Sequence, residues 1–230
     1  MNLYDYNSTE SLAEMMQEFQ STAVADIQYS IEAESSETLE GLRHVLYTHH
    51  TEEALFNAVE VSDIANMGMQ LFERLHFKVQ RDEKYSQLID AIILSFSYWV
   101  ARNDGLIPQL DFVVNTLART ANAIHEKTAL QSLYEVATYI IDAVPEDIKS
   151  SSSSLGASDP WRILVMNYCI ISTRTHTPEL MEKAFDVLLK YFSTEAPAFF
   201  QQGMNEMERI KYPSQVKAVI ERYSQKYAAH

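Results

Sequence analysis

The order of apolar and polar residues predicts helices along nearly the whole chain. Apolar residues recur at steps of three and four positions, the spacing of one helix face. Dipeptides typical of β-hairpin turns are almost absent; Asp104-Gly105 is the one candidate, and helical patterns flank it. We therefore predict an all-α protein of about nine helices, from this periodicity.

The first half of the chain is predicted to begin with a long helix. Its apolar stripe includes Leu12, Met16 and Phe19. The helices predicted up to the Asn103-Asp104-Gly105 break cover roughly residues 9–33, 36–49, 51–77 and 82–102.

A helix pair occurs twice, in residues 108–144 and 160–192. Both copies open on a proline, Pro108 and Pro160, and Asp159 is placed to cap the second copy. The match is one of pattern, so either a structural repeat or two generic amphipathic hairpins explains it. We favour stacked antiparallel helix pairs, resembling an α-solenoid, over a closed helical bundle. A final pair is predicted over 194–211 and 213–228.

We predict a single all-helical domain over residues 1–230. It would comprise acidic N-terminal helices (1–50), central helix pairs (51–146), a serine-rich loop (147–158) and C-terminal helix pairs (159–230). The loop prediction rests on five consecutive serines, Ser150 to Ser154, followed by Leu155-Gly156.

Composition adds a strong charge imbalance. The net charge is −14, and the first 60 residues hold twelve acids and one base, Arg43. This argues against binding of nucleic-acid phosphates or anionic membranes through that end, and favours a basic protein partner. No secretory signal is evident, and the longest apolar run, 91–101, is too short to span a bilayer. With one cysteine, Cys169, the chain is predicted to be cytoplasmic.

Three acids of the first predicted helix lie on one face. Glu10, Glu14 and Glu18 follow one another at four-residue steps. Two interpretations fit this spacing. The face is either an ordinary solvated surface or a docking surface for a basic partner, and we select these three residues as candidate partner-binding residues.

Metal-ligating residues form two weak candidate clusters and no cofactor is predicted. His49 and His50 precede Glu53 at a helix junction, and Glu73 precedes His76 by three positions. A di-iron bundle needs two Glu-x-x-His motifs and further carboxylates, and the chain has one. Metal binding is therefore not favoured, and His49 and His50 fit a helix C-terminus equally well.

Other catalytic signals are missing, so the sequence favours a binding protein over an enzyme. Glycine-rich phosphate loops and nucleophile elbows are absent, and Cys169, Tyr98, Trp99 and Trp161 are predicted to pack in the core. We predict a protein-binding adaptor or chaperone-like helical-repeat module. The alternative is a helical enzyme, or a small-ligand or metal-binding protein with a pocket between helices. A third hypothesis is nucleic-acid mimicry by the acidic end.

Overall fold

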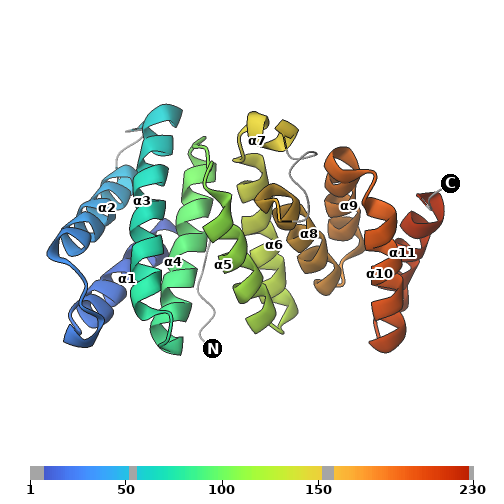
Figure 1. Ribbon diagram of the computed structural model, residues 1–230, viewed down its shortest axis with the longest axis horizontal. Coiled ribbons are helices and arrows are strands. Elements are labelled where there is room, and N and C mark those ends of the chain that lie inside the picture. The colour runs from blue at the N-terminus through green and yellow to red at the C-terminus, as the bar shows by residue number, and fades with distance from the viewer. Residues whose placement is uncertain (1–7, 52–55, 152–157, 228–230) are drawn as a thin grey trace. The chain divides into compact units, whose positions relative to one another are not determined.

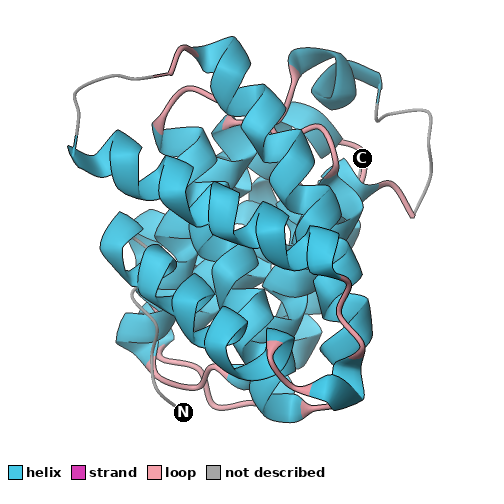
Figure 2. Ribbon diagram, turned by 90° about the vertical axis from the view of Figure 1, so that its left-hand side faces the viewer, coloured by secondary structure: helices cyan, strands magenta, loops and turns pink. Residues whose placement is uncertain are grey.

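The computed structural model describes residues 8–51, 56–151 and 158–227. Within these ranges every regular element is helical, which confirms the all-α prediction (Figures 1 and 2). They contain eleven α-helices rather than about nine. None of the helices described is both long enough and apolar enough to cross a membrane.

The chain packs as two compact units. Unit 1 comprises Met1–Ala123 and Glu135–Pro145, and unit 2 comprises Ile124–Tyr134 and Glu146–His230. Helix α6 (Lys127–Asp142) contributes residues to both. The single domain predicted from the sequence stays a prediction. The remaining helices of unit 1 are α1 (Thr9–Phe19), α2 (Ala33–Thr51), α3 (Ala58–Val79), α4 (Glu83–Arg102) and α5 (Leu110–Ala123).

Helix α4 is the centre of unit 1. Every residue from Leu88 to Val100 is buried, because α1, α3 and α5 all pack against this helix. A helix that is apolar on all sides is expected to be enclosed in this way. Asp82 caps its first turn by accepting hydrogen bonds from Lys84 N and Tyr85 N, so the start predicted near residue 82 is confirmed.

The predicted helix over 9–33 is wrong in its second half. Helix α1 ends at Phe19, and a π-helical turn (η1, Gln20–Val24) and a 3-10 turn (η2, Ile27–Tyr29) follow. The hydroxyls of Ser21 and Thr22 both donate to the carbonyl oxygen of Glu18, at 3.1 and 2.6 Å. Such local side-chain bonds compete with regular helix, and Ser30, with φ of 47°, ends the segment.

The predicted start of the next long helix, at residue 51, is also wrong. Helix α2 ends at Thr51, and α3 begins only at Ala58. Asn57 caps α3 with its side chain, while the Glu60 carboxylate accepts a hydrogen bond from Asn57 N. This capping box fixes the helix start more strongly than the apolar period does.

Unit 2 contains the second copy of the predicted pair. Its helices besides α6 are α7 (Glu146–Ser151), α8 (Pro160–Arg174), α9 (Pro178–Phe192), α10 (Ala196–Arg209) and α11 (Ser214–Lys226). Helices α8 and α9 pack together, as do α10 and α11. Asp159 caps α8 as predicted, through a 3.2 Å bond from Trp161 N.

The serine-rich loop predicted over 147–158 is wrong in its first part. Residues 146–151 form α7, which has Glu146 and Asp147 in its first turn and a Lys149–Glu146 ion pair of 3.0 Å. Acids near a helix N-terminus stabilise it. Residues 152–157 lie outside those that the structure describes.

Candidate functional site

The three acids that the sequence selects lie in one groove of unit 1. Glu10, Glu14 and Glu18 are exposed on α1, on the side away from its buried Leu12 and Met16. A groove of about 720 Å3 runs along this face, with α2 on its other side. Its lining residues are Thr9, Glu10, Ala13, Glu14, Gln17, Glu18, Ser21, Arg43 and Tyr47.

Two residues of α2 complete this acidic groove, and sequence reasoning missed both. Arg43 and Tyr47 are four positions apart and therefore share one face of their helix. The Tyr47 side chain is 62% exposed. The four-residue spacing was a usable signal, but the sequence does not say which face of α2 lies beside α1.

The electrostatics of the acidic groove favour a cation. Arg43, the one base among the described residues that line the groove, donates to Glu40 through Nη2 and Nε, at 2.5 and 3.3 Å. This guanidinium holds the pKa of the Glu40 carboxyl below its usual value. Because Glu40 already compensates Arg43, the carboxylates of Glu10, Glu14 and Glu18 dominate the field in the groove.

The metal candidates are not brought together in the described part of the chain. The side chains of His49 and His50, and the whole of Glu53, lie outside it. Glu73 is exposed on α3, whereas His76 is half-buried, with Nε2 at 3.6 Å from the Asp90 Oδ1 atom. Among the described residues, no group of three His, Cys, Asp or Glu side chains is placed to hold a metal ion.

His76 belongs instead to a charged cluster in the core of unit 1. Arg119 donates to both carboxylate oxygens of Asp90, at 2.6 and 3.0 Å, and to Thr116 at 2.9 Å. The His76 ring meets the Phe112 ring edge-on, with centroids 5.3 Å apart. Burial lowers the pKa of His76, so its imidazole is neutral at neutral pH.

Four residues predicted to pack in the core do so. Trp161 and Cys169 are fully buried, and Tyr98 and Trp99 are 8% and 4% exposed. Burial raises the pKa of the Cys169 thiol, whose sulfur lies 3.4 Å from the Ala184 carbonyl oxygen. A thiol that stays protonated is a poor nucleophile, which agrees with a packing role.

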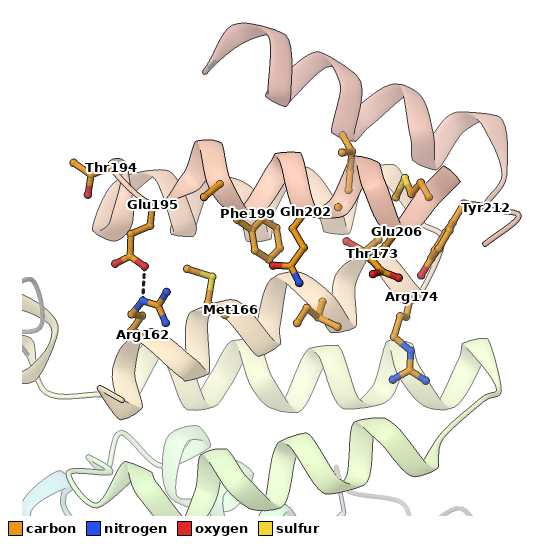
Figure 3. Close-up of a pocket in the computed structure, with 15 residues that line it drawn as sticks. Arg162, Met166, Thr173, Arg174, Thr194, Glu195, Phe199, Gln202, Glu206 and Tyr212 are labelled. Atoms are coloured by element: carbon orange, nitrogen blue, oxygen red, sulfur yellow. Dashed lines mark hydrogen bonds and ion pairs between the residues drawn. The ribbon is translucent and has the colours of Figure 1, made fainter. Parts of the chain in front are cut away.

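Unit 2 contains a cavity of about 650 Å3 between α8 and α10 (Figure 3). Side chains of α11 and of the α10–α11 connection complete it. The lining residues are Arg162, Met166, Ile170, Thr173, Arg174, Thr194, Glu195, Ala198, Phe199, Gln202, Gly203, Glu206, Met207, Tyr212 and Ile220. Pockets of this size, mostly apolar with a few polar groups, are typical of sites for small molecules. A pocket between helices is predicted from the sequence only as part of the alternative hypothesis, and none of these residues is predicted to line it.

Comparison with known proteins gives no further guide to function. No family model, no curated protein and no solved structure matches this chain.

Proposed function

We propose that this chain is a protein-binding helical module, and that the acidic groove between α1 and α2 receives a basic segment of a partner protein. The observation that carries the proposal is the composition of the groove: three carboxylates, an exposed tyrosine ring, and one base already bonded to Glu40. Lys and Arg side chains suit such a surface, since carboxylates attract them and an aromatic face binds cations.

The charge distribution of the chain supports the same partner chemistry. The first 60 residues carry twelve acids and one base, so their long-range field also attracts a basic segment. We extend the proposal to a stack of repeated helix pairs, because two pairs of similar length, α5–α6 and α8–α9, follow each other along the chain. A cytoplasmic location belongs to the proposal too, since the one cysteine is buried and reduced.

Nucleic-acid mimicry has less support. It requires the N-terminal acids to act together on one exposed surface. Several of these acids, although exposed, are instead bonded to other groups of unit 1. Glu32 pairs with Lys78 at 2.9 Å, Glu40 with Arg43, and Glu60 closes the capping box of α3.

The experiment is a binding titration of a fluorescent Lys-rich peptide against the full chain, read by anisotropy. The triple variant Glu10→Gln, Glu14→Gln, Glu18→Gln should weaken binding about tenfold, since exposed ion pairs contribute about 0.2–1 kcal/mol each. Added salt should weaken binding to the wild-type protein more than to the variant.

A matched control separates the groove from the overall charge. Glu179, Glu208 and Glu221 are exposed acids of unit 2, and changing all three to Gln removes the same charge. The control triple variant should bind within about twofold of wild type, as distant exposed charges are screened. Equal weakening in both triple variants would mean that net charge alone attracts the peptide. If the peptide does not bind the wild-type protein, the proposal is wrong and the acidic face is an ordinary solvated surface.

A further inference from the structure

The cavity of unit 2 differs chemically from the acidic groove. Its central lining is apolar, and it includes Met166 and Ile170 from α8 and Phe199 from α10. Ile170 is 47% exposed, which is unusual for a large aliphatic side chain with other apolar residues beside it. Figure 3 shows Met166 and Phe199 facing each other across the space between the two helices.

Each charged residue of the lining already has a partner in the protein. Arg162 of α8 pairs with Glu195 at the start of α10. Arg174 donates to the carbonyl oxygen of Ile124, and Figure 3 shows its side chain directed away from α10. Glu206 accepts a 3.1 Å bond from Arg209. An ionic ligand would therefore lose its hydration in a cavity where the Arg162, Glu195 and Glu206 side chains are already paired and the Arg174 guanidinium is directed away from α10.

The Arg162–Glu195 ion pair also limits the shape of the occupant. It joins α8 to α10 at one end of the cavity, as the dashed line in Figure 3 shows. From Arg162 to Arg174 the α8 helix rises about 18 Å, at 1.5 Å per residue. A partner helix, about 10 Å wide, cannot lie along this whole length while side chains bridge it at one end. A smaller molecule can enter between the ion pair and Tyr212.

Uncharged polar groups also line the cavity. The Gln202 amide reaches from α10 toward α8, and the Tyr212 hydroxyl lies toward the other end (Figure 3). Thr173 lines the cavity, and because its hydroxyl donates to the Cys169 carbonyl at 2.9 Å, its oxygen is left to act as an acceptor. We propose that the cavity binds an uncharged, mainly apolar small molecule that carries one hydrogen-bonding group. This site is independent of the proposed partner groove.

The test uses Nile red, an uncharged dye whose emission shifts to the blue in apolar surroundings, with the full chain. We expect one saturable site. Decanol should displace the dye at about tenfold lower concentration than decanoate or decyltrimethylammonium, because only the alcohol keeps the site neutral. Equal displacement by all three, or displacement by an apolar helical peptide but not by decanol, would overturn the proposal.

Matched variants locate the dye. Ala198 lines the cavity on α10, whereas Ala218 is exposed on α11 outside it. Ala198→Trp should abolish the dye signal and Ala218→Trp should leave it unchanged. Dye binding that survives Ala198→Trp would contradict the assignment.

A second variant covers the case in which Ala198→Trp does not fold. Arg162→Ala leaves Glu195 without its partner and makes the cavity acidic. The decyltrimethylammonium ion should then gain severalfold in affinity relative to decanol, while an unchanged order of the three competitors would count against a site between α8 and α10. The Glu10, Glu14 and Glu18 triple variant should bind the dye as wild type does, so either proposal can fail without the other.

Discussion

Helices α4 and α8 are both rich in apolar residues, yet their surroundings differ. In unit 1, α4 is covered on all sides, and its residues from Leu88 to Val100 are buried without a break. In unit 2, α8 buries Trp161 and Tyr168, while Met166 and Ile170 border a cavity. An apolar helix can thus serve either as the centre of a core or as the wall of a pocket. The number of neighbours that cover it decides between the two.

The two units also place their charged residues differently. Unit 1 joins the buried Asp90 to the partly exposed Arg119 in an ion pair and keeps the carboxylates of α1 at its surface. Unit 2 uses a half-buried pair, Arg162–Glu195, to close one end of its cavity. Removal of a charge is therefore expected to have its main effect on stability in unit 1 and on ligand selectivity in unit 2.

The largest effect on stability is expected when the buried carboxylate of Asp90 is removed. Asp90→Ala leaves the Arg119 guanidinium without its carboxylate partner. The free energy of unfolding should fall by about 2–3 kcal/mol; this is below the usual range for a broken buried pair because part of Arg119 is exposed to water. Asp63→Ala, at an exposed position of α3, should change it by less than about 0.5 kcal/mol.

The measurement can report on each unit separately. The chain has two tryptophans, Trp99 in unit 1 and Trp161 in unit 2. Fluorine NMR of protein labelled with 5-fluorotryptophan follows both during urea unfolding. The Trp99 signal of Asp90→Ala should unfold at lower urea than in wild type. A joint shift of both signals would mean that the two units unfold together, so that the loss of stability is not confined to unit 1.

Substitutions at two glycines compare the tightly packed core of unit 1 with the cavity of unit 2. A Cβ atom on Gly68 would lie 2.6 Å from the Phe96 ring, which is held between Phe72 and Trp99. Gly68→Ala should therefore cost about 1–3 kcal/mol.

Gly203 gives the opposite expectation. A Cβ atom there would meet the end of the Ile220 side chain at 3.0 Å, and Ile220 borders the cavity and can move into it. The small cost of that movement is offset by the better helix propensity of alanine, so Gly203→Ala should stay within about 1 kcal/mol of wild type. Thermal unfolding of both variants provides the test. A loss of stability in Gly203→Ala as large as in Gly68→Ala would show that unit 2 is as tightly filled as unit 1.

The smallest expected effect concerns pH. Burial lowers the pKa of His76 in unit 1 and of His176 in unit 2 below the ordinary value of 6.5. Asp90 opposes this shift at His76 and Arg119 adds to it, while Lys127 adds to it at His176. The unfolded chain then binds protons at a higher pH than the folded chain. Stability should therefore fall as pH drops through 6.5 and level off below the folded-state pKa values.

Single substitutions show whether a buried histidine causes this pH dependence. Urea unfolding between about pH 8 and about pH 5 should show a smaller loss for His76→Gln than for wild type. His125→Gln serves as the control, because His125 is exposed between α5 and α6. If the wild-type protein instead becomes more stable in acid, the two histidines do not control the pH dependence of its stability.

The sequence alone determined that this protein is helical and that Glu10, Glu14 and Glu18 share one helix face. Helix periods and caps are local, so α4 and the two predicted pairs, α5–α6 and α8–α9, begin and end within a few residues of the predicted bounds. The breaks at Phe19 and Asn57 were missed because hydroxyl back-bonds and a capping box outweigh the apolar period there.

Only the tertiary structure decided which side chains meet. Tyr47 lies beside the acids of α1, Arg119 neutralises Asp90 within an apolar run, and Arg162 reaches Glu195 across 33 residues of sequence. These contacts depend on which helices pack together, and helix packing is set by side-chain shapes over whole faces rather than by residue spacing. The periodicity of α8 therefore predicts its helix, but the cavity beside it exists only because α10 does not fill that face.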